Sequence, residues 1–315
     1  MIISVSRRTD IPAFYMPWLI NRIKAGFVLV PNPYNRKRLS RVLLSPDIVE
    51  CLVFWSKNPA PLLEAQRFLV SGANVSDKNA LDWLDDHGYR YYFQLTLTPY
   101  DRSVEKNLPA KAEILKTIAR LSNRVGPSRV IWRYDPIILD AEFSPDFHKK
   151  AFADLCSKLT ALVRHCVISF ADSYPRLERK IEKPEQSALE KTVQALSEIA
   201  ASHQLKLFAC AEEADYADFG IQRSACVDGG INAELNAKTG SLLKLTGGKD
   251  RNQRKECSCV SSVDIGMYGS CLHGCTYCYA GQSRRYGPRG LNAHDPESPM
   301  LCGWPRGDEI IMDRV

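Results

Sequence analysis

The feature that most constrains the fold is a series of short apolar runs that alternate with amphipathic helical patterns. Six runs rich in β-branched and aromatic residues lie at 2–6, 51–55, 91–98, 129–134, 167–170 and 205–210. They are apolar at nearly every position, which is typical of strands buried on both faces of a parallel sheet. Apolar residues recur at helical spacing between several of them, at 109–125, 152–162 and 189–199. The alternation predicts repeated strand–helix–strand units and a parallel sheet.

At least six such units favour an α/β fold built as a (β/α) barrel or a partial TIM-like barrel over an open sheet. The expected organisation places barrel units in residues 1–210, with a hairpin insertion at 27–45. A Cys-rich segment at 211–280 would complete the barrel, and 281–315 would form an irregular C-terminal tail. In such folds the active site lies at the carboxyl ends of the strands. Polar residues follow several of the predicted strands and would form a rim there.

Cysteine is the unusual entry in an otherwise ordinary composition, with 11 residues in a chain of 315. No stretch approaches the roughly 18–20 apolar residues of a membrane helix, and the first residues lack a signal-peptide pattern. We therefore expect a cytoplasmic protein without membrane contact. In a reducing compartment, clustered cysteines are metal ligands or catalytic thiols more often than disulfides.

Three of the cysteines, Cys271, Cys275 and Cys278, follow a C-x3-C-x2-C spacing. A loop of this length can place three thiolates at three corners of a cubane cluster, and thiolates suit iron–sulfur chemistry. The spacing favours a [4Fe–4S] cluster with one open iron. A structural zinc site would need a fourth ligand, for which His273 is a candidate, and the alternative without any metal also stays open.

Four further thiols, Cys210, Cys226, Cys257 and Cys259, lie within an irregular segment of about 50 residues. Four thiols are enough for a complete tetrathiolate site, which would hold a second [4Fe–4S] cluster or a zinc ion. The alternative is four unrelated cysteines. The other four cysteines have no local partners, and three of them lie in apolar contexts typical of core residues, namely Cys51, Cys156 and Cys166.

The string from Tyr268 to Ala280 resembles the cluster loop of radical S-adenosyl-L-methionine (SAM) enzymes, most closely the branch that contains spore photoproduct lyase. This resemblance implies a [4Fe–4S] cluster whose open iron is chelated by the amino and carboxylate groups of SAM. An electron donor such as flavodoxin or ferredoxin would then drive the cleavage of SAM to a 5′-deoxyadenosyl radical, which abstracts hydrogen from a substrate. The resemblance places Tyr279 near the adenine.

In that superfamily the cluster loop follows the first strand, whereas here it follows the others. Four segments resemble the second, third, fourth and fifth strand regions of the lyase branch, namely 6–12, 54–58, 94–101 and 133–138. We therefore expect a circular permutation in which 263–268 supplies the usual first strand. The whole chain also resembles a bacterial family with an N-terminal SRRTDIP segment and a C-terminal cysteine cluster, a resemblance that implies no particular reaction.

The strand matches imply a set of SAM-binding residues. They assign Thr9 and Asp10 to the amino group, and Thr96, Thr98 and Arg133 to the ribose or carboxylate. Lys57 and Asp135 are expected in the same space, because they also stand at strand ends.

The sequence thus predicts a radical SAM enzyme that acts on an unidentified substrate. One alternative is a non-catalytic iron–sulfur protein with a binding or redox role. Another is a nucleic-acid repair or modification enzyme of the same chemistry. The net charge of +6 and the basic segments 35–41 and 249–255 support that third hypothesis only weakly, since few aromatic residues accompany them.

Overall fold

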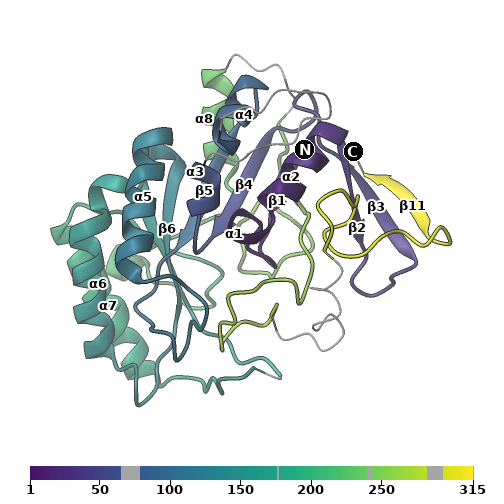
Figure 1. Ribbon diagram of the computed structural model, residues 1–315. Coiled ribbons are helices and arrows are strands. Elements are labelled where there is room, and N and C mark those ends of the chain that lie inside the picture. The colour runs from purple at the N-terminus through teal and green to yellow at the C-terminus, as the bar shows by residue number, and fades with distance from the viewer. Residues whose placement is uncertain (65–78, 176, 240–242, 244, 282–293, 315) are drawn as a thin grey trace.

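The chain forms an α/β structure around one eight-stranded sheet (Figure 1). The computed structural model describes residues 1–315 except 65–78, 176, 240–242, 244, 282–293 and 315. Every strand pairing in this sheet is parallel, as the apolar runs predict. The order across the sheet is β10 (Val263–Asp264), β1 (Ile2–Val5), β4 (Cys51–Ser56), β5 (Tyr91–Thr96), β6 (Val130–Ile137), β7 (His165–Phe170), β8 (Leu207–Ala209) and β9 (Gln222–Arg223).

Seven helices lie in the connections between β1 and β8 within the described residues. They are α1 (Ile11–Phe14), α2 (Met16–Ala25), α3 (Ala60–Leu63), α4 (Ala80–Asp86), α5 (Lys111–Val125), α6 (Pro145–Leu159) and α7 (Gln186–Ser202). Their buried residues share one hydrophobic cluster with alternate residues of the strands. Because side chains alternate across a strand, all these helices cover the same face of the sheet. In Figure 1, α5, α6 and α7 stand together along one side of it.

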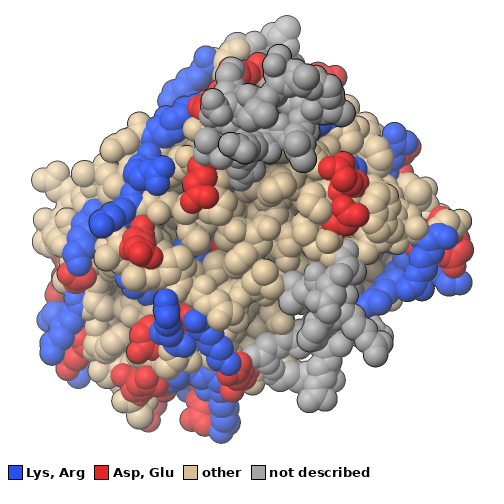
Figure 2. Space-filling view, viewed as in Figure 1, with Lys and Arg blue, Asp and Glu red and all other residues tan. Residues whose placement is uncertain are grey.

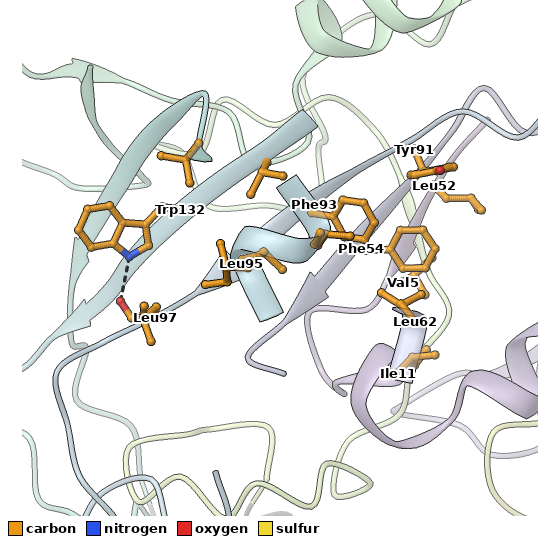
Figure 3. Close-up of a cluster of buried hydrophobic side chains, with 14 of the residues drawn as sticks. Val5, Ile11, Leu52, Phe54, Leu62, Tyr91, Phe93, Leu95, Leu97 and Trp132 are labelled. Atoms are coloured by element: carbon orange, nitrogen blue, oxygen red, sulfur yellow. Dashed lines mark hydrogen bonds between the residues drawn. The ribbon is translucent and has the colours of Figure 1, made fainter. Parts of the chain in front are cut away.

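Aromatic side chains pack among aliphatic ones on this helix-covered face (Figure 3). The rings of Phe54 and Phe93 stack at 5.2 Å between centroids, and Trp132 stacks on Phe152 of α6 at 5.1 Å. Trp132 is 1% exposed, and its indole N–H donates to the Leu97 carbonyl at 2.9 Å. Such rings bury a large apolar area while the one polar atom keeps a partner, so this layer stabilises the sheet strongly.

The opposite face of the sheet packs against the segment that carries the four cysteines. Ile2, Val53, Tyr92 and Ile131 form a second cluster with residues of helix α8 (Gly229–Lys238) and with three of those cysteines. The sequence pattern did not indicate α8, which has two buried asparagines. One of them, Asn232, donates to the buried carboxylate of Glu50 at 3.0 Å.

The sheet is open within the described part of the chain. Its edge strands are β10 and β9, and no pairing joins them, so the closure expected of a complete barrel is not seen. Strands β8, β9 and β10 have three, two and two residues. Strands this short offer few hydrogen bonds for closing a sheet. The apolar runs in the sequence indicate where strands begin but not how many of their residues pair with a neighbour.

A second, three-stranded sheet lies beside the first. The expected hairpin is formed by β2 (Phe27–Pro31) and β3 (Arg38–Leu43), which pair antiparallel. Strand β11 (Ile310–Arg314) pairs parallel with β3, as Figure 1 shows. The C-terminal segment expected to be irregular therefore includes a strand, while its residues 282–293 lie outside the described part.

Local signals explain several helix boundaries. The Ser144 hydroxyl caps the N-terminus of α6, followed by Pro145 at its first position. A capping box between Asn79 and Asp82 begins α4. Helix α2 ends at Gly26, whose φ of 79° favours glycine.

Strand β10 joins the sheet beside β1, although the two are about 260 residues apart in sequence. Just after it, Gly266 approaches the β1 end so closely that a Cβ atom there would lie 2.1 Å from Ser6 Oγ. Only glycine fits this approach without a shift of the backbone. The segment that leads into Cys271 is thereby fixed at the carboxyl end of β1.

The surface offers no large patch of one charge on the face seen in Figure 2, where acidic side chains are interspersed among basic ones around a neutral centre. Among the described helices, none combines the length and apolar character needed to cross a bilayer.

Candidate functional site

A cavity of about 390 Å³ lies at the carboxyl ends of the strands, where the polar rim was predicted. This volume is in the range of roughly 300–1,000 Å³ that is usual for small-molecule sites. The predicted residues that line it are Thr9, Asp10, Lys57, Thr96, Arg133, Asp135, Tyr279 and all seven clustered cysteines. Thr98 is buried near the cavity but does not line it.

The cysteine loop, defined here as residues 271–278, is fastened to the ends of β1 and β5. The Thr9 hydroxyl donates to the Met267 carbonyl at 2.7 Å and pairs with the Ser270 hydroxyl at 2.6 Å. Asn107 donates its side-chain amide to the Leu272 carbonyl at 2.7 Å and its backbone N–H to the His273 carbonyl at 3.0 Å. These contacts fix the segment that leads into the loop and the first residues of the loop itself.

Asp10 joins three segments at the base of this loop. Its carboxylate caps α1 by accepting from Ala13 N at 3.0 Å, and it also accepts from Lys57 N at 2.7 Å. The same oxygen that accepts from Lys57 lies 2.7 Å from His273 Nε2. Thr9 and Asp10 are thus engaged with protein groups, so their polar atoms position the loop.

A buried carboxylate that the sequence analysis missed lies under the loop. Glu105 is 1% exposed and accepts from Lys57 Nζ at 2.7 Å and from the Tyr277 hydroxyl at 2.6 Å. It also accepts from the Thr98 hydroxyl at 2.8 Å and pairs with Lys111. Burial alone would raise the pKa of Glu105, but the two lysines lower it to about 2. Glu105 is therefore ionised and holds Tyr277, which lies between two of the loop cysteines.

Arg133 is fixed between the predicted Asp135 and a thiol. Its Nε donates to Asp135 at 2.9 Å, and its Nη1 donates to Cys226 Sγ at 2.7 Å. Burial disfavours the charged guanidinium, yet Asp135 and Cys226 raise the pKa of Arg133 well above its ordinary value. Asp135 also accepts from the Ser169 hydroxyl. Arg133 accordingly stays charged at the cavity wall.

The four-cysteine group, Cys210, Cys226, Cys257 and Cys259, comes together on the sheet face that α8 covers. The Sγ atoms of Cys210 and Cys226 lie 2.9 Å apart. The neighbouring thiols of Cys226 and Cys257 lower the pKa of Cys259 below its ordinary range. The sequence placed these thiols in one segment, and the structure brings their side chains together.

Tyr279 lies at the mouth of the cavity and is 48% exposed. Its ring tilts against that of Tyr174, with centroids 5.1 Å apart. The structure also reveals a wall that the sequence analysis missed, because Trp55 lies between the guanidinium groups of Arg7 and Arg133, at 5.2 and 5.4 Å from its ring centroid.

The thiols of Cys271 and Cys275 in the cysteine loop are neutral in their present surroundings. Burial raises the pKa of Cys271 and of Cys275 to about 12 in each case. Backbone N–H groups of Asp10 and His273 work against this at Cys271. Within the described residues, no group of three or more His, Cys, Asp or Glu side chains is arranged so that it could hold a metal ion. The remaining cysteines, Cys51, Cys156, Cys166 and Cys302, are buried in the hydrophobic clusters.

A family model described as "Domain of unknown function (DUF1848)" matches residues 2–280. The chain belongs to this family. The matched DUF1848 region includes every residue of the cavity named above and ends just after the cysteine loop.

Comparisons with other proteins add little to this assignment. A search of curated proteins gives no match for the chain. One similar solved structure is the C-terminal domain of a protein assigned as a chitinase from Desulfitobacterium hafniense DCB-2, at 12% identity over 80% of this chain and 70% of that chain, with a TM-score of 0.28. Another is a protein assigned as an alpha-L-fucosidase from Bacteroides thetaiotaomicron VPI-5482, at 10% identity over 71% of this chain and 78% of that chain, with a TM-score of 0.24. At these scores the similarity carries no argument about fold or activity.

Proposed function

We propose that this chain is a radical SAM enzyme that binds a [4Fe–4S] cluster through Cys271, Cys275 and Cys278. The observation that carries the proposal is that these three thiols line the same cavity as the candidate SAM-binding residues, at the carboxyl ends of parallel strands. The spacing of the cysteines and the location of the cavity are independent observations that point to the same site.

The donor set fits such a cluster. Three thiols lie on one short loop, and binding of iron would replace the protons that burial retains on Cys271 and Cys275. Lys57 contributes positive charge that favours the thiolate of Cys275. A cubane cluster also holds its thiolates farther apart than a single ion does, so a three-cysteine loop does not need the close sulfur contacts of a zinc site.

When bound, the cluster supplies the electron that cleaves SAM reductively. The residues of the chain hold and orient the reactants. Thr9 and Asp10 fix the cysteine loop, while Thr96, Arg133 and Tyr279 present a hydroxyl, a guanidinium and a ring face to the cavity. The buried Glu105 keeps Lys57 charged beside the loop.

The permuted partial barrel belongs to the same proposal. All crossover helices cover one face of the sheet, as in a barrel wall, and β10 stands beside β1 so that it takes the place of a first strand. This arrangement is compatible with a circular permutation, in which the segments that resemble radical SAM strands follow one another in a rotated order along the chain. We further propose an electron donor of the flavodoxin or ferredoxin class as partner, and a cytoplasmic location.

The test is the formation of 5′-deoxyadenosine by protein reconstituted anaerobically with iron and sulfide, then given SAM and dithionite. We expect wild type to form it and Cys275→Ala to form none. Cys156→Ala is the matched control, because Cys156 is also buried but lies on α6 and does not line the cavity. A fully loaded wild-type protein that forms no 5′-deoxyadenosine would favour the non-catalytic iron–sulfur alternative instead.

A further inference from the structure

The four-cysteine group brings together thiols from three separate stretches of the chain. Cys210 follows β8, Cys226 follows β9, and Cys257 and Cys259 precede β10. Three of the four are at most 7% exposed. Cysteine is a common core residue, but here thiols from distant stretches gather in one place: the Sγ atoms of Cys210 and Cys226 lie 2.9 Å apart, and Cys259 Sγ accepts from the N–H of Val227, the residue after Cys226.

The backbone around these thiols is held from the sheet. The Cys226 carbonyl accepts from the Tyr92 hydroxyl at 2.9 Å and from the Gln94 amide at 2.8 Å. Val227 N donates to Cys259 Sγ at 3.3 Å. Cys210 N donates to the Ile168 carbonyl at 2.9 Å. Because strands and their direct contacts fix these segments, the sulfurs are positioned in advance for a shared ligand.

Two guanidinium groups face the sulfurs. Arg133 donates to Cys226 Sγ, and Arg7 interacts electrostatically with Cys226, Cys257 and Cys259. Arg7 is half-buried, and its buried Nη2 has no hydrogen-bond partner among the described residues. Arg133 also pairs with Asp135, and Asp264 adds a negative charge near Arg7, so the sulfurs share these two guanidinium groups with carboxylates. Four thiolates around a centre of charge +2 carry a net charge of −2, which two guanidinium groups offset.

We propose that Cys210, Cys226, Cys257 and Cys259 are the four thiolate ligands of a second metal centre, separate from the cysteine loop. The ligand chemistry is shared by Zn²⁺ and by an iron–sulfur cluster. The sulfurs of a tetrahedral zinc site with bonds of about 2.3 Å lie about 3.8 Å apart. The 2.9 Å contact between Cys210 and Cys226 must therefore open by about 1 Å for zinc, and by more for a cluster.

The proposal does not depend on SAM chemistry, because the two sets of cysteines do not share a residue. The experiment therefore uses full-length chain carrying Cys271→Ala, Cys275→Ala and Cys278→Ala, which removes the cysteine loop as a metal site. We expect this variant to retain about one zinc ion, or about four iron and four sulfide ions, per chain. Elemental analysis and sulfide determination distinguish the two sources.

A second measurement leaves the four-cysteine group intact. It therefore does not depend on a variant that lacks these cysteines and fails to fold. The folded variant that lacks the three loop cysteines is alkylated, and the modified cysteines are identified by peptide mass spectrometry. The four thiols should remain unmodified until a chelator is added. The four should then react at least tenfold faster, while the buried control Cys156 should be unchanged. Zinc protection and iron–sulfide protection both support the proposal.

Three results would overturn it. A folded loop variant that holds no metal after supply of zinc or of iron and sulfide would do so. Equal alkylation with and without chelator is the second. A disulfide between Cys210 and Cys226 in freshly isolated, metal-free protein is the third, since the short contact would then reflect a redox pair.

Discussion

Replacement of Glu105 by glutamine tests whether the buried carboxylate holds the site together. Glu105 is 1% exposed and faces two lysines, the Tyr277 hydroxyl and the Thr98 hydroxyl. Its pKa is about 2, against an ordinary value of 4.5. A difference of this size corresponds to about 3 kcal/mol of stability at neutral pH. That agrees with the roughly 3–5 kcal/mol lost when one partner of a buried ion pair is removed.

The assay is equilibrium unfolding in urea at pH 7, followed by circular dichroism. Glu105→Gln should lower the free energy of unfolding by about 3 kcal/mol, or the Tm by about 6 °C for a chain of this size. The matched control is Glu178→Gln, which makes the same chemical change in the exposed pair with Lys106 and should cost at most about 0.5 kcal/mol.

The pH dependence gives the sign of the effect. Because folding lowers the pKa of Glu105, its contribution is complete above pH 4.5 and is lost as the pH falls toward 2. The difference between wild type and Glu105→Gln should therefore shrink across that window. If Glu105→Gln and Glu178→Gln unfold at the same urea concentration at pH 7, the assigned role of Glu105 is wrong.

Three further predictions concern contacts elsewhere in the fold. Phe152→Ala, which removes the ring stacked on Trp132, should cost about 3–5 kcal/mol in urea unfolding, whereas Phe147→Ala at a less buried ring should cost less. Burial lowers the pKa of His148 to about 4 from 6.5, so the stability of the fold should decrease as the pH drops from 6.5 to 4. His148→Gln should reduce the slope of Tm against pH in this range, and an unchanged slope would contradict the prediction. Thr9→Val, which removes the hydrogen bonds to Met267 and Ser270, should reduce iron loading of the cysteine loop severalfold, whereas Thr9→Ser should load like wild type.

The strands could be predicted because their apolar runs record burial on both faces of the sheet. The same reasoning placed the cavity at the carboxyl ends of β1, β4, β5 and β6. Closure of the sheet could not be predicted, since a run such as 205–210 shows that a strand exists but not that it pairs over only Leu207–Ala209. Helix α8 was missed because buried asparagines bonded to Glu50 and to each other interrupt its apolar pattern.

The candidate site, too, was predicted in part from the sequence and missed in part. The position of the cysteines in the sequence indicated both groups of thiols, one through its C-x3-C-x2-C spacing and the other because four thiols lie within one segment of about 50 residues. Glu105 left none: it lies in a loop after β5, and two of its partners, Lys57 and Tyr277, come from distant segments. Arg7 was noted only as part of a polar stretch, and its position over Trp55 depends on tertiary packing.

The most direct test of the proposed function is electron paramagnetic resonance of the dithionite-reduced, reconstituted protein with and without SAM. We predict that SAM changes the spectrum of a [4Fe–4S] cluster in wild type and in Cys156→Ala, and that Cys275→Ala lacks this change. A second centre held by four thiolates would contribute a signal that does not respond to SAM if it is an iron–sulfur cluster, and no signal if it is zinc. If the fully loaded wild-type protein gives the same spectrum with and without SAM, the cysteine loop does not hold an open-iron cluster that binds SAM.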